Sequence, residues 1–336
     1  MTQYKYNDWI YQLKDGNFDI EWPENIKLPE TVYKYYPNTE YSFDAVLKQY
    51  LFCSHPYHLN DSIDSTSLLW DFSNLTEGVY NKFYAQYGLD QVYEVNYQKE
   101  KKNGFVNIKA RFFELVSKNA GIISLTTEPL QTLMWAHYAS ESGFMVELDW
   151  QEIKNNLKKL NPKLNNYAFF PIQYVDNLES VDFFGKDFNS PDLPYIYSTG
   201  VKRKDWDYEN EWRLIPFSMD YGIPNSLLGP YDDLLCKNER KLYYPKSTIK
   251  SIALGKRFFN GKNLEKVIDD RTYMLKKSKD LDFILFLMEN FNDRIYFCGE
   301  YENSKVFKRS AEKIHFEQID EQTIRIVRED EGFYQK

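Results

Sequence analysis

The sequence predicts an α+β fold in which mixed, mainly antiparallel central sheets carry a helical insert. Short runs rich in β-branched and aromatic residues recur along the 336-residue chain, bounded by turn formers, which is typical of strands. Helical spacing of apolar residues is confined to a few segments, and the longest runs from Leu68 to Val116. With 43% hydrophobic and 27% charged residues, the composition is that of an ordinary globular protein.

Three parts follow one another along the chain, although no Pro-, Gly- or Ser-rich linker separates them. Residues 1–30 are aromatic and acidic, and we expect an irregular arm that packs onto the body. Residues 31–260 are predicted to form an α+β core that carries the catalytic or binding site, with a helical insert over about residues 68–118. Residues 261–336 are predicted to form a helix-and-strand extension packed on this core.

The core is predicted to open with a strand over Thr31–Tyr36, which Pro37 and Asn38 end. Apolar residues at helical spacing follow, and then a second short strand and a polar loop. For the last part of the chain we expect a helix over 264–289 and strands over 294–327. The core segments expected after the first strand are, in order, a helix over 41–50, a strand over 51–54, the helical insert, a strand over 121–126, a helical turn over 129–138, a strand over 143–148, a helix over 150–160, and strands over 172–175, 211–216 and 249–254.

The net charge of −8 disfavours sequence-independent binding to nucleic-acid backbones, which relies on many Lys and Arg contacts. Four basic stretches weaken this argument, because together they could line one positively charged face. Taken singly, each is more typical of a solvated helix face. The four stretches are Lys99–Lys102, Lys109–Lys118, Lys202–Lys204 and Lys237–Lys250.

The cysteines and histidines indicate a reducing compartment and no metal site. Cys53, Cys236 and Cys298 lie far apart without paired spacing, which argues against a disulfide framework and a zinc knuckle. Of the histidines, only His55 and His58 lie close together in the sequence. No apolar run is long enough for a membrane-spanning helix, and the N-terminus lacks the pattern of a signal peptide. We therefore expect a cytoplasmic protein without a membrane partner.

Two carboxylates one residue apart, Glu209 and Glu211, are the first candidate for chemistry. On a strand, this spacing turns both side chains to one face, together with Arg213. Like charges so placed repel each other, so one carboxylate should have a raised pKa unless a cation such as Arg213 lies between them. The alternative is an exposed strand with an ordinary Glu/Arg ladder.

A second group combines a histidine with aromatic and hydroxyl side chains. His137 is suited to proton transfer near neutral pH, while Trp135 and Tyr138 could clamp a planar ring. A lone histidine among apolar residues is, however, more often a hydrogen-bonded core residue. Ser124 and Thr126 alternate on the strand before this group, where they could orient a ribose or cap the following helix.

A third candidate is Asn60-Asp61, which follows the second short strand. Either side chain could bond a substrate hydroxyl, but Asn-Asp is also a standard turn former. Of the sharper generic motifs, the chain has no Gly-rich phosphate loop, GxSxG elbow, HExxH or CxxC pair. Common nucleoside-triphosphate and hydrolase sites are therefore disfavoured. The aromatic content of 18% is high, and we interpret most of it as core packing and a few rings as stacking surfaces.

Taken together, these motifs resemble a bacterial family known as domain of unknown function 2971 (DUF2971), whose name supplies no activity. The resemblance covers roughly residues 31–260. Family members usually carry Asn-Asp-Pro where this chain has Ser62 after Asn60-Asp61. The matching stretches are VYKYY (Val32–Tyr36), Ser54–Ser62, IISLTTEP (Ile122–Pro129), MWAHYA with GFMVELD (Met134–Asp149), KRKDWDYENEWRLI (Lys202–Ile215) and IKSIALG (Ile249–Gly255).

More distantly, the order of elements is similar to that of ADP-ribosyltransferases. That family uses a basic or His residue on a first strand, a Ser/Thr-containing strand and a late Glu. The counterparts here would be Lys34 or Tyr35, then Ser124-Leu125-Thr126, then Glu211 with Glu209 as an ExE pair. Lys34 replaces the usual Arg or His, and a point charge does not reproduce a planar fork on pyrophosphate. The resemblance implies NAD as the substrate and a late carboxylate that stabilises the charge developing as nicotinamide leaves.

Our leading hypothesis is therefore an NAD-dependent ADP-ribosyltransferase of the toxin or phage-defence kind, which modifies a nucleic-acid or protein acceptor and is controlled by a cognate antitoxin. Two alternatives remain open: an NAD glycohydrolase or metal-independent nuclease or hydrolase, with His137 and the Glu pair as acid and base, and a non-catalytic module that senses a ligand or a phage component. The catalytic candidates are Glu211, Glu209 and His137. The candidates for contact with NAD are Tyr33, Lys34, Tyr35, Asn60, Ser124, Thr126, Met134, Trp135, Tyr138 and Arg213.

Overall fold

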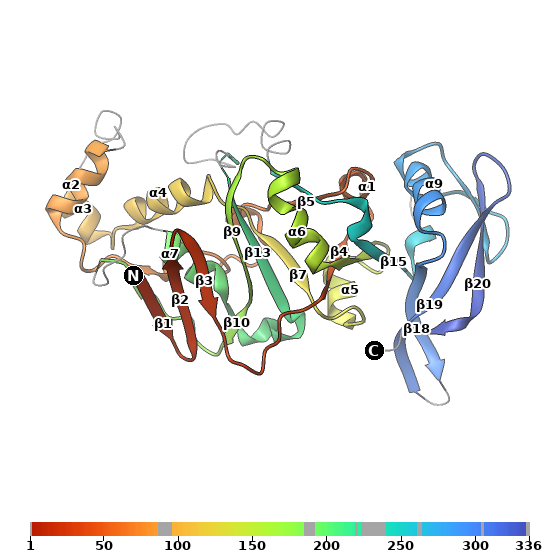
Figure 1. The fold of residues 1–336 in the computed structure, drawn as a ribbon, viewed down its shortest axis with the longest axis horizontal. Helices are drawn as coiled ribbons and strands as arrows, with labels where there is room; N and C mark the ends of the chain where they lie inside the picture. Colours follow the sequence, from red (N-terminus) through yellow and green to blue (C-terminus); the bar gives the residue numbers. More distant parts are fainter. Residues whose placement is uncertain are drawn as a thin grey trace.

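The computed structural model describes residues 2–86, 96–184, 192–218, 221–222, 240–260, 264–303 and 306–333. Within these residues it shows an α+β architecture around one large sheet, whose strands follow the order β16-β17-β20-β19-β18-β15-β8-β4-β7-β13-β9 (Figure 1). Every pairing in this sheet is antiparallel except that between β15 and β18. The predicted α+β class with mainly antiparallel sheets is thus confirmed.

The N-terminal segment differs from its prediction, because it forms a three-stranded antiparallel meander rather than an irregular arm. The meander packs on the body through Tyr11, which is fully buried and donates its hydroxyl to Gln173 Oε1 at 3.3 Å. Three tyrosine rings of the meander, those of Tyr4, Tyr6 and Tyr11, each meet the ring of Tyr197 edge-on. Trp9 and Tyr11, two residues apart on the middle strand, project to one face and are buried, which explains why a short aromatic stretch becomes a sheet. The strands are β1 (Thr2–Tyr6), β2 (Trp9–Lys14) and β3 (Asn17–Glu21).

The core half of the large sheet follows the predicted strands closely. It also contains a strand that the sequence did not predict, β9, which forms the end of the sheet beside β13. Among the described strands, β9 pairs with β13 alone. The core strands are β4 (Thr31–Tyr36), β7 (Ile123–Thr126), β8 (Phe144–Asp149), β9 (Leu164–Pro171), β13 (Glu211–Ser218) and β15 (Ile249–Gly255).

Helices and short strands surround the core strands. Helix α6 illustrates the local causes: Asp149 caps its N-terminus by accepting a bond from Glu152 N, and Trp150, Ile153 and Leu157 form its buried stripe. The core helices are α1 (Glu40–Leu47), α5 (Thr132–Tyr138), α6 (Trp150–Leu160) and α7 (Asp192–Gly200). The short strands form the pairs β5 (Tyr50–Phe52) with β14 (Lys241–Tyr243) and β10 (Gln173–Val175) with β12 (Val201–Arg203).

The insert is mainly helical, as predicted, and lies at one end of the elongated molecule in Figure 1. Within its described residues the insert also contains a two-residue strand, which pairs in parallel with a short segment between β10 and β12. The elements are β6 (Trp70–Asp71), α2 (Glu77–Gln86), α3 (Tyr97–Lys102), α4 (Val106–Ser117) and the partner strand β11 (Val181–Asp182).

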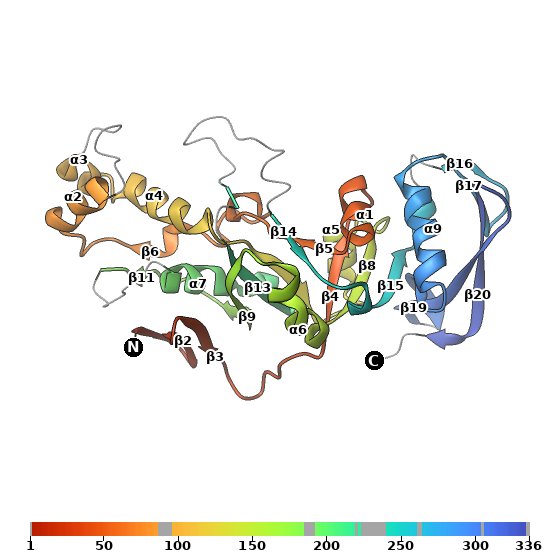
Figure 2. The same ribbon diagram turned by 45° about the horizontal axis from the view of Figure 1, so that its top comes forward.

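The C-terminal part lies at the opposite end of the molecule (Figures 1 and 2). The predicted helix from Leu264 is wrong at its start, because residues 264–275 form a hairpin that pairs with a later strand. Helix α9 begins at Lys279 and packs against α1, where Phe283 stacks on Phe43 at 4.7 Å between ring centroids. The elements are β16 (Leu264–Val267), β17 (Thr272–Leu275), α9 (Lys279–Phe291), β18 (Ile295–Asn303), β19 (Val306–Gln318) and β20 (Thr323–Phe333).

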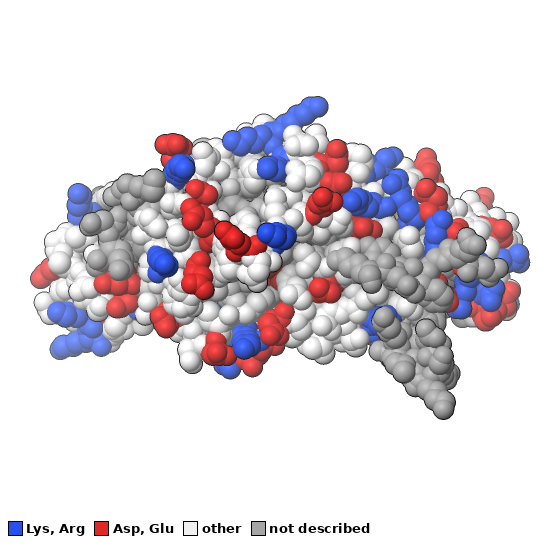
Figure 3. Space-filling view, turned by 60° about the horizontal axis from the view of Figure 1, so that its bottom comes forward, with Lys and Arg blue, Asp and Glu red and all other residues white. Residues whose placement is uncertain are grey.

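Charged side chains of both signs are interspersed on the face shown in Figure 3, and the described residues there form no broad basic patch. One predicted basic stretch is not a solvated surface at all, because Lys202 is only 3% exposed. Lys237, where another predicted basic stretch begins, and Cys236 both lie outside the described residues. Residues 240–250 of that stretch are described. None of the helices that the structure describes is both long and apolar enough to span a membrane.

Candidate functional site

A pocket of about 240 Å³ lies where strands β4 and β7 separate. These two strands pair at a single position, Tyr33 opposite Thr126, and the cavity is lined by residues of both strands. All predicted site residues except Trp135 and His137 line it. The predicted residues that line the pocket are Tyr33, Lys34, Tyr35, Asn60, Ser124, Thr126, Met134, Tyr138, Glu209, Glu211 and Arg213.

The register of the sheet explains why hydroxyl and charged groups meet here. Glu211 lies opposite Thr126, and Arg213 lies opposite Ser124, in the antiparallel pairing of β13 with β7. Residues directly opposite each other project to the same face, so all four side chains point to the pocket side of the sheet. The Ser124 side chain acts to lower the pKa of Glu211, and Thr126 donates its hydroxyl to the Glu209 carbonyl at 2.5 Å.

Glu209 does not lie on a strand, contrary to the prediction. It ends a 3-10 helix, η4 (Lys204–Glu209), and Asn210 then adopts a left-handed conformation with φ of 40° before β13 begins. Asn tolerates this conformation better than most residues, because its short polar side chain can bond locally. The two carboxylates still meet, since Lys202 Nζ lies 2.5 Å from Glu209 Oε2 and 3.3 Å from Glu211 Oε2.

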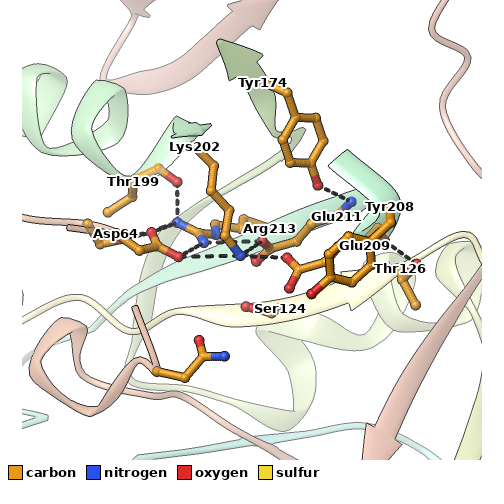
Figure 4. A network of polar contacts seen from close by, with 12 residues as sticks. Asp64, Ser124, Thr126, Tyr174, Thr199, Lys202, Tyr208, Glu209, Glu211 and Arg213 are labelled. Atoms are coloured by element: carbon orange, nitrogen blue, oxygen red, sulfur yellow. Dashed lines mark hydrogen bonds and ion pairs between the residues drawn. The ribbon is translucent and has the colours of Figure 1, made fainter. Parts of the chain in front are cut away.

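The cation between the carboxylates is therefore Lys202, whereas Arg213 holds Glu211 from the other side (Figure 4). Arg213 is 1% exposed; its Nε lies 2.8 Å from Glu211 Oε1, and its terminal nitrogens lie 2.6 and 2.8 Å from the two Asp64 oxygens. The Thr199 carbonyl accepts a further bond from it at 2.7 Å. Three buried carboxylates thus share two buried cations, which leaves one excess negative charge in the network.

Burial and the neighbouring charges separate the pKa values of the two glutamates. Burial, and next the charge of Glu211, raise the pKa of Glu209, and Lys202 offsets them only in part. For Glu211, burial also acts to raise the pKa, but Arg213 and Lys202 outweigh it and hold the pKa well below the usual range. Glu211 is therefore a fixed carboxylate, while Glu209 is the member of the pair that accepts a proton more readily.

Lys34 brings another cation to the pocket. Its Nζ donates to the Ser124 carbonyl at 2.8 Å, in the region where β4 and β7 no longer pair. Burial lowers the pKa of Lys34 to about 8, against the opposing effect of Glu211. The charge of this side chain consequently changes within the range of mildly alkaline pH.

Tyr138 and Asn60 close one side of the pocket. Tyr138 donates its hydroxyl to Glu209 Oε1, and Asn60 Nδ2 donates to the Tyr138 hydroxyl at 3.3 Å. Asp61 acts as the turn former, because its carboxylate accepts a bond from Ile63 N at 3.0 Å. The two readings of Asn60-Asp61 thus apply to different residues: Asn60 lines the pocket and Asp61 shapes the loop.

Two predicted site residues lie elsewhere. Trp135 is fully buried, donates its indole N–H to the Pro129 carbonyl at 2.9 Å, and meets the ring of Tyr35 edge-on. It is a core residue behind the pocket and not a pocket wall, because α5 turns it away from the cavity. His137 is exposed, and its Nδ1 lies 3.0 Å from the hydroxyl of Tyr208. It is therefore neither the core histidine of the alternative interpretation nor a residue lining the cavity.

Sequence reasoning missed Asp64 and Lys202. Lys202 stands in a basic run, and such runs are usually solvated; its burial follows from its place on the short strand β12, which pairs with β10. Asp64 lies in a polar loop far from Arg213 in the chain, so only the folded loop brings the two together. No spacing rule in a single sequence signals such a long-range pair.

Chemically, the pocket offers carboxylates, hydroxyls, tyrosine rings and the Lys34 ammonium group. These groups can bind a sugar's hydroxyls, stabilise a positive charge and accept a proton. Among the residues described, no group of three His, Cys, Asp or Glu side chains is arranged to hold a metal ion. Hydroxyl groups, an aromatic ring or an anionic group of a ligand would each find a partner in this lining.

Comparison with known proteins gives one family match. The DUF2971 model, described as a protein of unknown function, matches residues 134–214, which run from α5 to the first half of β13. No curated protein and no solved structure matches the chain significantly. The matched region holds Tyr138, Lys202 and the two glutamates, whereas Lys34, Asp64 and Ser124 lie outside it. The chain thus carries a DUF2971 region over residues 134–214.

Proposed function

We propose that the protein is an NAD-dependent ADP-ribosyltransferase that modifies a macromolecular acceptor, as expected of a toxin or phage-defence protein. The observation that supports this proposal is the convergence of Glu211, Glu209 and Ser124 on one pocket, at the point where two strands separate. The pocket presents a fixed carboxylate beside a second carboxylate with a raised pKa. Pairs of titratable groups with separated pKa values divide the roles of electrostatic stabiliser and proton acceptor.

In the proposed reaction, Glu211 binds a hydroxyl of the nicotinamide ribose and stabilises the positive charge that develops on this sugar. The glycosidic bond between ribose C1′ and the nicotinamide nitrogen breaks, and nicotinamide leaves with the bonding electron pair. A hydroxyl or amine of the acceptor forms a new bond to C1′. Glu209 takes the proton that this group loses, which its raised pKa favours.

The other pocket residues have binding roles in this proposal. Tyr33, Tyr35 and Tyr138 offer rings against nicotinamide or adenine, and Thr126 and Asn60 offer polar groups to the ribose. Lys34 faces the pyrophosphate as a point charge. Arg213 binds Asp64 and Glu211 and so positions the carboxylate instead of contacting NAD. His137 has no role in the bond-breaking step, because it does not line the pocket.

NAD carrying a label in its adenylate half, incubated with the protein and an extract of host cells, tests the proposal. We expect wild-type protein to transfer the label to macromolecules and Glu211→Gln to lose this activity. Asp205→Asn is a matched control, because Asp205 lies on the same 3-10 helix as Glu209 but, among the described residues, forms an ion pair with the exposed Arg203 alone. Circular dichroism of each variant shows whether it is folded.

The same assay separates the alternatives. Nicotinamide release without transfer of the label would indicate an NAD glycohydrolase, and would contradict transfer to a macromolecule. Nucleic-acid cleavage without NAD would indicate a nuclease. Absence of all three activities in the folded wild-type protein would leave the non-catalytic sensing module and overturn the proposal. If the protein is a toxin, co-expression of the gene beside its own should suppress its toxicity and so reveal the cognate antitoxin.

A further inference from the structure

A second cavity, of about 610 Å³, follows the outer edge of strand β9. Strand β9 ends the large sheet, because it pairs with β13 on one side and, among the described strands, with none on the other. Strand β3 of the meander lies on one side of this edge and helix α6 on the other (Figure 1). We call this cavity the edge groove. Its floor is formed by the strand segment Asn166–Phe169.

The walls of the edge groove are aromatic on both sides. Phe18 and Trp22 contribute from the meander side, and Trp150 contributes from α6. Trp150 stacks on Phe169 at 3.6 Å between ring centroids, so the α6 wall packs directly against the floor. Leu28 adds an exposed apolar side chain, 44% exposed, at the rim. A floor and walls of this kind accept apolar side chains of a bound segment.

The charge of the edge groove comes from α6. Lys154 and Lys158 lie one turn apart on this helix, both are exposed, and within the described part of the chain neither has an ion-pair partner. The acidic residue of the lining, Asp19, accepts a hydrogen bond from Gln12 Nε2 at 3.1 Å. The lining therefore carries a net positive charge, in a protein whose net charge is −8.

The floor offers backbone groups at the spacing of a strand. The Tyr167 N–H bonds the Asn166 side chain at 2.8 Å, which shows that it points away from β13. In an antiparallel ladder the outward direction recurs every second residue, so Phe169 presents its N–H and C=O to the same side. Pro171, which has no N–H, follows at the end of the strand, as is typical of an edge. Between Tyr167 and Pro171, β9 has no pairing partner other than β13 among the described strands.

We propose that the edge groove binds an extended, acidic segment of a partner protein, which adds a strand to β9. An unpaired sheet edge recognises such a segment through its backbone, while pockets beside the edge select alternate side chains. Lys154 and Lys158 select acidic residues of the segment, and the aromatic walls select apolar ones. Lysines and aromatic rings could also bind a nucleic acid. A nucleic acid, however, has no peptide backbone that could pair with the backbone groups of the floor.

A library of random twelve-residue peptides, selected on the full-length protein, tests this proposal. We expect the enriched peptides to alternate acidic with β-branched or aromatic residues and to lack proline in the middle. Fluorescence anisotropy with a labelled member then measures affinity. In the double variant Lys154→Glu/Lys158→Glu we expect affinity to fall at least about tenfold, because two favourable charges become repulsive.

Lys159→Glu is the matched control, since Lys159 is exposed on the same helix but does not line the edge groove. We expect this variant to bind the peptide as wild type does. A proline placed at the centre of the peptide should abolish binding if strand addition is correct, because it removes a backbone donor. Amide exchange at Phe169 should slow on binding.

Four results would overturn the proposal. They are failure of the library to yield enriched peptides, enrichment of basic peptides, equal binding of the proline-containing peptide, and equal loss of affinity in the Lys159→Glu control. Displacement of the bound peptide by a short single-stranded oligonucleotide, with tighter binding of the oligonucleotide, would assign the edge groove to nucleic acid and would also contradict the proposal.

Discussion

The pocket between β4 and β7 and the edge groove on β9 differ in the burial and pairing of their charged side chains. In the pocket, Asp64, Glu209 and Glu211 are buried and meet the buried cations Lys202 and Arg213. In the edge groove, Lys154 and Lys158 are exposed and, among the described residues, have no ion-pair partner. Buried charges require partners in the folded chain, whereas exposed charges do not.

The two regions also use strand pairing differently. Strands β7 and β13 pair fully beneath the pocket and so hold Glu211 and Arg213 at defined positions. Among the described strands, β9 pairs with β13 on one side only, and we propose that its other edge binds a partner segment. A fixed arrangement of charges suits chemistry, whereas an open sheet edge beside unpaired charges suits recognition of a partner. Substitutions in the pocket should therefore affect stability, and those in the edge groove should not.

Replacing Arg213 should have the largest effect. Arg213→Met removes the partner of two buried carboxylates, and breaking a buried pair in this way costs about 3–5 kcal/mol. Urea unfolding at neutral pH measures this loss. A loss below about 1 kcal/mol would show that Asp64 and Glu211 find other partners or water, and would remove the contrast between the two regions.

The two glutamates should differ from each other. At pH 7, Glu211→Gln should reduce the free energy of unfolding more than Glu209→Gln, because the folded state favours the ionised form of Glu211 and disfavours that of Glu209. Each pKa unit of difference corresponds to about 1.4 kcal/mol. The stability that Glu211 contributes is fully present above its unfolded pKa of about 4.5 and is lost as pH falls toward its folded pKa.

Unfolding of both variants and of the wild type at pH 7, 5 and 4 gives the test. The gap between the two variants should be widest at pH 7 and narrow below about pH 4.5, where the unfolded chain takes up a proton at Glu211 and the folded chain does not. A larger loss for Glu209→Gln, or a gap that widens in acid, would mean that the assignment of the two pKa shifts is reversed.

Lys34 should make NAD binding sensitive to alkaline pH. Its pKa is lowered to about 8, so its charge is mostly present at pH 7 and mostly lost at pH 9. Under the proposed function, affinity for NAD should fall by about tenfold over this range, in step with the charged fraction. Isothermal titration calorimetry measures the affinity. Lys34→Arg should bind NAD independently of pH over the same range, because Arg stays charged. A flat profile for the wild type would remove Lys34 from phosphate binding.

The smallest effect is expected in the edge groove. Lys154→Met and Lys158→Met should each change the free energy of unfolding by no more than about 0.5 kcal/mol, as is usual for exposed side chains without partners. The measurement is the same urea unfolding that is used for Arg213→Met. A loss near 2 kcal/mol in either variant would show that the lysine stabilises the fold, and would weaken its assignment to ligand recognition.

The sequence predicted the fold well where local patterns decide it. The strand over Thr31–Tyr36 and the helix over Trp150–Leu160 have the predicted bounds, because turn residues and a capping Asp mark their ends. The prediction failed where the pairing of strands determines the structure, as in the N-terminal meander and in the hairpin that begins at Leu264. Their strands are short, and their form depends on neighbours that a local pattern does not contain.

The site shows the same division. Alternation along a strand predicted that Ser124 shares a face with Thr126, and Glu211 with Arg213, because the period of a strand is fixed. The register of β7 with β13 then brings both pairs to one face of the sheet. The positions of Lys202 and Asp64 depend on a short strand and a loop that meet β13 from elsewhere in the chain. Trp135 was misplaced because the direction of a helix face depends on what the helix packs against.

The most direct test of the account is the rate of nicotinamide release by folded protein saturated with NAD, measured in the host-cell extract that supplies the acceptor and alongside transfer of the label. Wild-type protein should release nicotinamide, and Glu211→Gln should do so about 10²–10³-fold more slowly. Its affinity for NAD should fall much less than this rate, because Glu211 acts mainly on the charge that develops during bond cleavage. Equal rates in the two proteins, or no release by the wild type, would contradict the assignment of this pocket to NAD chemistry.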